Sequence, residues 1–167
     1  MDAPTLQSEE PTLESEDVDR YLTFTTDDMF YAFPIRNVTE IIGMQTITTV
    51  PDVPPFIKGV INLRGKVIPL MDVRLRLGLP GVEYNDRTCI IVVEVTDRSV
   101  GVIVDAVSDV LTIDTAQIEP PPDYRSGNDT HYISGMAKRE EGIVVVLDAE
   151  ELLRISETDA RRGSGAS

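Results

Sequence analysis

A repeated pattern of apolar residues limits the possible folds of this chain more than any other feature of its sequence. Residues 31–42 (YAFPIRNVTEII) resemble residues 100–111 (VGVIVDAVSDVL), 69 positions later. Self-similarity of this kind indicates two copies of one supersecondary unit. The matched pairs are Phe33 with Val102, Ile35 with Val104, Val38 with Val107, Glu40 with Asp109, and Val50-Pro51 with Glu119-Pro120.

A second pair of segments extends the repeat. Residues 56–60 (FIKGV) resemble residues 132–136 (YISGM), 76 positions later, and in both copies an aspartate follows the glycine after thirteen residues. The larger offset requires seven extra residues in the second copy, and residues 123–130 (DYRSGNDT) are turn formers that suit an insertion. The sequence therefore predicts two related units, near 21–77 and 90–153.

Each unit has the pattern of short β-strands. The runs YLTFTT and MFYAF flank Asp27 and Asp28, which suit a two-residue turn. Helical signal is confined to residues 73–79 and 149–155. Four or five short strands make a poor open sheet, whereas closure into a barrel removes the exposed edges. We predict one small barrel per unit, and the two packed around a shared core.

The charge of the chain excludes several classes of partner. The 167 residues include 29 acidic and 15 basic residues, for a net charge of −14. Nucleic acids and anionic membrane surfaces need basic patches, so neither is an expected partner. No apolar run approaches the ~20 residues of a membrane-spanning helix, and the N-terminus does not resemble a signal peptide. We therefore expect a cytoplasmic protein.

The two ends of the chain differ from its middle. Residues 1–19 contain seven acidic residues and neither lysine nor arginine, a composition that favours disorder. The sequence predicts a disordered acidic tail over 1–18, a folded region over 19–156 and a flexible tail over 157–167. Only three of the fifteen basic residues are lysines. Together with the acid excess and modest alanine content, this favours a salt-loving source, such as a halophilic archaeon.

The motifs of common enzymes and metal sites are absent from the sequence. The chain has no Gly-rich phosphate loop, no HExxH and no CxxC. Its only cysteine, Cys89, lies in an apolar run and is expected to be inert, and its only histidine, His131, offers no evident pairing. Asp72 and Asp148 each follow a strand, and we expect them to cap a helical turn rather than form a catalytic pair. We predict no catalytic residue, metal or cofactor.

The Arg-Gly pair at 64–65 is the strongest candidate for recognition. It connects two apolar runs, and Gly65 can supply the positive φ of a tight turn, which places Arg64 in solvent. Arg64 is expected to have apolar neighbours in Ile61, Leu63 and Val67. Its counterpart in the second unit is Glu140. The residue is either a turn residue that favours solubility or an interface anchor, a role in which arginine is enriched.

The segment 56–80 (FIKGVINLRGKVIPLMDVRLRLGLP), preceded by VPDVPP and followed by VGVIVDAVSDVL, closely resembles the CheW family of bacterial and archaeal chemotaxis. The resemblance extends over residues 20–155. It implies a mainly β fold of two five-stranded SH3-like β-barrels around a shared hydrophobic core, with a short C-terminal helix. It also implies a non-enzymatic adaptor that couples the cytoplasmic tips of methyl-accepting chemoreceptors to the regulatory domain of the histidine kinase CheA, which has the same fold.

The resemblance also implies two binding surfaces. A receptor helix would lie in a groove lined by Val38 and Leu63, and the kinase surface would lie around Asp109 in the second unit. Ala106 stands where glycine is expected in this family. The implied receptor-binding residues are Val38, Glu40, Lys58, Asn62, Leu63 and Arg64, and the implied kinase-binding residues are Val104, Asp105, Val107 and Asp109.

Three alternatives remain open from the sequence. The chain could be a CheW-like scaffold for another two-component kinase pathway, such as one for motility or development. The same domain also occurs fused to a receiver domain or to the kinase, although the early end in RRGSGAS favours a free-standing adaptor. A small-ligand-binding barrel or an enzyme is the third alternative.

Overall fold

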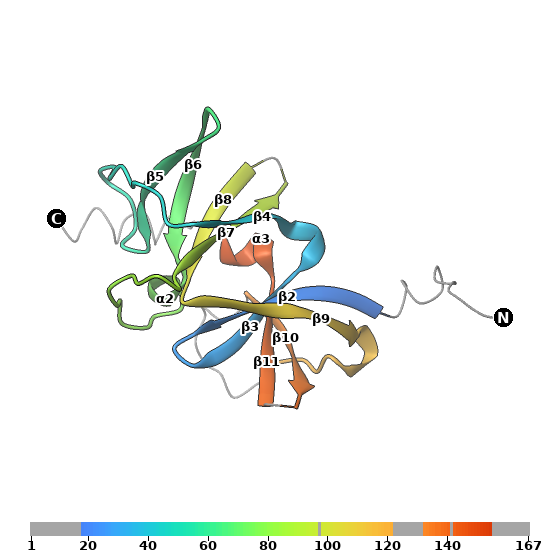
Figure 1. Ribbon diagram of the computed structural model, residues 1–167. Coiled ribbons are helices and arrows are strands. Elements are labelled where there is room, and N and C mark those ends of the chain that lie inside the picture. Colours follow the sequence, from blue (N-terminus) through green and yellow to red (C-terminus); the bar gives the residue numbers. More distant parts are fainter. Residues whose placement is uncertain (1–17, 97, 122–131, 141, 155–167) are drawn as a thin grey trace.

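A computed structural model describes residues 18–96, 98–121, 132–140 and 142–154. The predicted tails, apart from Val18, lie outside these residues, as do the predicted insertion at 123–130 and His131. The described chain is mainly β (Figure 1). Its strands are β2 (Val18–Thr26), β3 (Met29–Pro34), β4 (Val38–Gly43), β5 (Ile57–Leu63), β6 (Lys66–Asp72), β7 (Cys89–Val95), β8 (Arg98–Val104), β9 (Ala106–Asp114), β10 (Ile133–Arg139) and β11 (Gly142–Leu147). Its helices are α2 (Val73–Arg76) and α3 (Ala149–Leu152), with 3₁₀ turns η1 (Ile35–Asn37) and η2 (Thr115–Gln117).

The strands form two five-stranded sheets with the same internal order. The first, called barrel 1, has the order β10-β11-β3-β2-β9, and the second, called barrel 2, has the order β5-β6-β8-β7-β4. In the repeat, strands β2 to β6 correspond in order to β7 to β11. If each strand in the order of barrel 1 is replaced by the corresponding strand of the other repeat, the order of barrel 2 results. The predicted duplication therefore matches the topology, and the prediction of two five-stranded sheets is confirmed.

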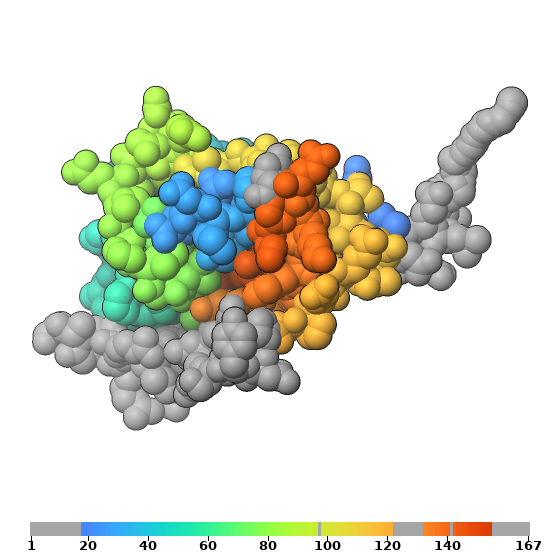
Figure 2. Space-filling model, turned by 90° about the horizontal axis from the view of Figure 1, so that it is seen from below, coloured from blue at the N-terminus to red at the C-terminus, as the bar shows by residue number. Residues whose placement is uncertain are grey.

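The prediction that each repeat forms its own barrel, over 21–77 and 90–153, is wrong. Barrel 1 takes β2 and β3 from the first repeat and β9 to β11 from the second, so that β3 pairs in parallel with β11. Figure 2 shows these early and late parts of the chain packed side by side. The physical reason is η1, which ends β3 and directs β4 onto β7 of the other sheet. The two repeats have similar strands, and a strand can pair equally well with its neighbour in its own repeat or with the corresponding strand of the other repeat. Sequence similarity therefore does not show in which sheet a strand lies.

A short bridge closes each sheet. Thr48 and Val60 exchange two backbone hydrogen bonds of 2.9 and 2.8 Å, which join the segment after β4 to β5. Glu119 and Met136 exchange two bonds of 2.8 Å and join the segment after β9 to β10. Closure leaves few unpaired edge groups. Because these bridges are equivalent, the counterpart of Glu119 is Thr48, and the sequence alignment of Glu119 with Val50 is wrong by two residues.

Asp72, the last residue of β6, and Asp148, directly after β11, cap helical turns, as predicted. Asp72 Oδ1 accepts a hydrogen bond from the backbone N–H of Arg74 at 2.9 Å, and Asp148 Oδ1 accepts one from Glu151 at 3.1 Å. These bonds satisfy N–H groups that the first turn of a helix leaves without a partner. The helices end after four residues and are shorter than the predicted 73–79 and 149–155.

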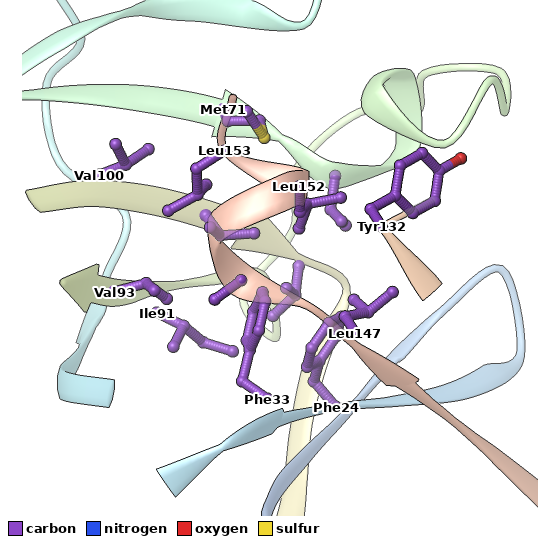
Figure 3. Close-up of a cluster of buried hydrophobic side chains, with 14 of the residues drawn as sticks. Phe24, Phe33, Met71, Ile91, Val93, Val100, Tyr132, Leu147, Leu152 and Leu153 are labelled. Atoms are coloured by element: carbon purple, nitrogen blue, oxygen red, sulfur yellow. The ribbon is translucent and has the colours of Figure 1, made fainter. Parts of the chain in front are cut away.

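The main core lies between the barrels and is built by both. Phe24 and Phe33 of barrel 1 pack with ring centroids 5.3 Å apart, and they share one buried cluster with Ile91 and Val93 of barrel 2 (Figure 3). Leu152 of α3 completes the cluster. Such mutual burial stabilises two barrels that are each too small for a large core of their own.

Candidate functional site

The turn between β5 and β6 presents Arg64 to solvent. Leu63 pairs with Lys66, so the connecting loop is only Arg64 and Gly65, at φ 54° and 85°. Two consecutive positive φ values are typical of a type I′ hairpin turn. Asn62 Oδ1 accepts a hydrogen bond from the Gly65 N–H at 2.8 Å and fixes the turn. The Arg64 side chain is 69% exposed, as the sequence predicted.

Arg64 forms an ion pair with Glu40, whose side chain is 28% exposed. Glu40 lies on β4 and Arg64 on the β5–β6 turn, and these strands are the two ends of the barrel 2 sheet. The ion pair therefore bridges the two end strands of barrel 2. Arg64 Nη2 donates to Glu40 Oε2, and a guanidinium carries five N–H donors, so donors remain for a partner.

The other predicted receptor residues are distributed unevenly. Asn62 is exposed and Leu63 is half-buried against the interior of barrel 2, both next to Arg64. Lys58 is near the opposite end of β5, and Val38 is half-buried against the shared core. The structure therefore brings Glu40, Asn62, Leu63 and Arg64 together and places Lys58 and Val38 outside this group.

One predicted neighbour of Arg64 is wrong. Ile61 is 2% exposed and lies inside barrel 2, because alternate residues of a strand face opposite sides of the sheet. Val67, also a predicted neighbour, is 66% exposed. Ile41 follows Glu40 on β4 and is 44% exposed. It pairs with Ile91 of the shared core, whereas Glu40 pairs with Val92 of the barrel 2 interior, so it lies on the other side of the strand from Glu40.

The predicted kinase residues include one that is in the core. Val104 is 1% exposed and belongs to the shared cluster, so the prediction that it contacts a partner is wrong. Strand β8 is buried on both sides between the barrels, and no alternation in its sequence marks an outer face. Val107 is half-buried against the same cluster. Ala106 has no positive φ, so its methyl group meets no left-handed strain in the turn.

Asp105 joins the two barrels. It lies between β8 and β9, and its carboxylate accepts hydrogen bonds from Arg74 Nε at 3.0 Å and Nη2 at 2.8 Å. It also accepts the backbone N–H of Asp27, in the β2–β3 turn, at 3.0 Å. Arg74 follows β6 of barrel 2, whereas Asp27 belongs to barrel 1. The predicted kinase residue Asp105 therefore has a structural role between barrels.

Comparison with known proteins gives the family of the fold. Residues 20–157 match the CheW-like domain. The chain belongs to the CheW-like family. It is 38% identical to the chemotaxis protein CheW of Klebsiella aerogenes over 82% of each chain, and 37% identical to that of Bacillus subtilis over 85% of this chain and 91% of the other. The crystal structure of the scaffolding protein TtCheW from Thermoanaerobacter tengcongensis superposes with a TM-score of 0.77 at 33% identity, covering 84% of this chain and 96% of that one.

The described residues of this CheW-like chain offer neither a metal site nor a membrane-spanning helix. Within them, no three His, Cys, Asp or Glu side chains are grouped to hold a metal ion. No helix in the part of the chain that the structure describes is long and apolar enough to span a membrane. The Cys89 thiol is half-buried, and burial raises its pKa, which agrees with an inert side chain.

Barrel 1 of this CheW-like chain has a second acid–arginine pair that the sequence comparison missed. Asp109, the counterpart of Glu40, lies 3.3 Å from Arg139 Nη2 across the end strands β9 and β10. The arginine is one residue before Glu140, the position aligned with Arg64. Arg139 is only 10% exposed and stacks 4.4 Å from the centroid of Phe30. Both barrels therefore have an acid–arginine pair across their end strands. Arg139 of barrel 1 is largely buried by its neighbours, whereas Arg64 of barrel 2 is accessible to a partner.

The carboxyl groups of Asp105 and Asp109 both have lowered pKa values. Burial alone would raise the pKa of Asp105, but the hydrogen bonds from Arg74 and the Asp27 N–H, with the Arg74 charge, outweigh it. For Asp109, the hydrogen bond from the Thr23 hydroxyl is the main cause of the lower pKa, with a contribution from Arg139. Both carboxylates therefore favour the folded state while they are ionised.

Acid is expected to weaken the link between the barrels. The stability from Asp105 is present above its unfolded pKa near 3.8 and is lost as the pH falls through the lower folded value. Arg74→Gln removes this contribution. The free energy of unfolding of the variant should therefore be about 1–2 kcal/mol lower than that of the wild type at pH 7, and should depend less on pH below 4. Urea unfolding at several pH values measures both, with the exposed Arg87→Gln as control. Parallel pH curves for wild type and Arg74→Gln would contradict this role.

Proposed function

We propose that this CheW-like chain is a non-enzymatic adaptor that couples methyl-accepting chemoreceptors to the histidine kinase CheA. The observation that carries the proposal is the exposed Arg64 on a rigid two-residue turn, paired with Glu40. Arginine on a rigid element is suited to recognition because its planar fork of donors loses little freedom on binding. An adaptor needs such surfaces and no reacting group.

The receptor surface is proposed around this ion pair. Leu63, half-buried next to Arg64, supplies apolar area beside the Glu40–Arg64 pair, and Asn62 supplies an exposed amide. An amphipathic helix from the cytoplasmic tip of a receptor would place its apolar side on Leu63. A carboxylate or helix-terminal carbonyl of the receptor would then accept from the free donors of Arg64.

The kinase surface is proposed at the start of β9, in barrel 1. Asp109 is 48% exposed in spite of its bonds to Thr23 and Arg139, and Val110 beside it is also about half exposed. Val107 and Asp105 lie at the same end of the strand but are partly covered. A charged residue beside an exposed aliphatic one suits contact with another folded domain. The regulatory domain of CheA, expected to have the same fold, is the proposed partner.

The two surfaces lie on different barrels, which would allow both partners to bind at once. The net charge of −14 makes nucleic acid an improbable partner on electrostatic grounds. The proposed location is the cytoplasm, at receptor arrays that the chain reaches through the receptors.

Reconstitution tests the proposal. Vesicles that contain a methyl-accepting receptor are mixed with CheA, with and without this chain, and then sedimented. We expect the chain to raise the amount of sedimented kinase severalfold and to make its autophosphorylation dependent on receptor ligand. Kinase that sediments equally well without the chain, or whose activity does not respond to receptor ligand in its presence, would contradict the adaptor function.

A further inference from the structure

An apolar groove opens beside α3, on the opposite side of β6 from the barrel 2 interior. Its volume is about 310 Å³. Met71, Val100 and Leu153 of the shared core, each no more than 6% exposed, form its floor, and Figure 3 shows them at one end of the core cluster. Val67, at 66% the most exposed of the large apolar side chains that the structure describes, lies on the rim. An exposed aliphatic side chain at the mouth of a hollow lined by apolar residues gives an apolar group of an occupant a place to bind.

Two cations also line the groove. Lys66 Nζ lies 3.5 Å from the Ser99 hydroxyl, and Arg98 Nη2 donates to the Leu153 carbonyl at 3.0 Å. Among the residues that the structure describes, neither cation forms an ion pair with a carboxylate. Apolar lining favours an apolar occupant, and the two cations favour an acidic one. Most of the surface of a chain with a net charge of −14 would repel such an acidic occupant, so these cations would direct it to this groove.

The first seventeen residues of this chain have that chemistry twice. Residues 4–10 read PTLQSEE and residues 11–17 read PTLESED, so a Pro-Thr-Leu triplet is followed by acidic residues in each copy. The leucines, Leu6 and Leu13, are the only large apolar side chains between Met1 and Val18. A duplicated motif of one leucine and several carboxylates matches one apolar groove with cations beside it.

We propose that the groove binds the N-terminal segment of the same chain, residues 4–17. A leucine of a PTL motif fills the space between Val67, Val100 and Leu153. The carboxylates that follow this leucine pair with Lys66 and Arg98. The contact buries apolar area that is otherwise exposed and compensates two cations with charges from the most acidic part of the chain.

A continuous surface leads from the first strand to the groove. Asp19, in β2, pairs with Arg36 at 2.6 Å. Arg36 lines a cavity together with Thr96 and Glu150, and both of these line the next cavity together with Arg98. Arg98 also lines the groove. Leu6 is twelve residues before Val18 and can extend ~40 Å, more than the ~30 Å diameter of a small domain.

The groove begins directly after the Arg64–Gly65 turn, so a bound segment lies beside the receptor surface put forward above. This consequence rests on the proposed function. The contact itself does not, and its test needs no receptor.

A spin label on the full chain tests the contact. Cys89→Ala removes the native thiol, and Ser8→Cys carries a nitroxide between the two PTL motifs. We expect the amide signals of Val67, Ser99 and Val100 to broaden at least twofold more in the oxidised than in the reduced sample. Lys66→Glu and Leu6→Ser with Leu13→Ser should each abolish this difference, whereas the matched charge reversal Arg87→Glu should keep it.

Two results would overturn the proposal. One is equal signals in the oxidised and reduced samples while the spectrum remains that of the folded chain. The other is broadening that persists in Lys66→Glu. A mixture of isotope-labelled chains without nitroxide and unlabelled chains with it separates contact within a chain from contact between chains. Broadening only in such a mixture would contradict binding by the same chain.

Discussion

Arg64→Glu is expected to weaken the affinity for the receptor at least about tenfold, which corresponds to about 1.4 kcal/mol of binding free energy, while the fold stays intact. The change removes the donors proposed to meet the receptor and places a carboxylate opposite Glu40, so that both like charges repel an acidic partner. Folding should be little affected, because Arg64 is 69% exposed and exposed ion pairs contribute about 0–1 kcal/mol. Sedimentation with receptor vesicles measures the binding, and urea unfolding measures the stability.

Arg87→Glu is the matched control for this loss. Arg87 is exposed in the loop before β7, and its replacement makes the same change in net charge. A general effect of added negative charge would reduce receptor binding equally in both variants. Equal binding by Arg64→Glu and Arg87→Glu would therefore count against the proposed surface.

Gly59→Ala should unfold at a much lower urea concentration than the wild type, with a loss of about 3 kcal/mol or more. A Cβ at this position would lie 2.2 Å from the Thr48 carbonyl oxygen, a backbone atom that cannot move without opening the bridge to Val60. Gly59 also has φ 146°, which L-residues rarely adopt. The loss combines about 1–3 kcal/mol of backbone strain with about 1 kcal/mol for each broken hydrogen bond.

Gly43→Ala is the control for the glycine prediction. Gly43 ends β4, a Cβ there would have nothing within 4 Å, and its φ is not positive. Its free energy of unfolding should stay within about 0.5 kcal/mol of the wild type, as for most surface changes. Stability of Gly59→Ala within that same range would show that closure of barrel 2 does not depend on the glycine.

Much of the local structure could be predicted from the sequence. Asp27 and Asp28 form the two-residue turn that the flanking strands indicated, and both have positive φ. Asp72 and Asp148 cap their helical turns because the carboxylate is next to unpaired N–H groups. These features depend on a few neighbouring residues, so a local pattern was sufficient to find them.

Long-range pairing could not be predicted in the same way. Strands β9 to β11 occupy in barrel 1 the places that β4 to β6 would have if each repeat formed its own barrel, and β4 to β6 occupy the corresponding places in barrel 2. The sequence pattern of each strand is the same in either arrangement, so the pattern cannot distinguish them. The same limit applies to Val104, which is buried because two barrels meet over β8. Arg139 was missed because a shift of one residue separates it from the position aligned with Arg64.

The central claim is that the Glu40–Arg64 surface of barrel 2 binds the receptor. The most direct measurement is an NMR titration of the isotope-labelled chain with a helical fragment from the cytoplasmic tip of a chemoreceptor. We expect the largest amide shifts on Glu40, Leu63 and Arg64, and no change in the signals around Arg87. Shifts centred elsewhere, with the β5–β6 turn unperturbed at saturation, would contradict the claim.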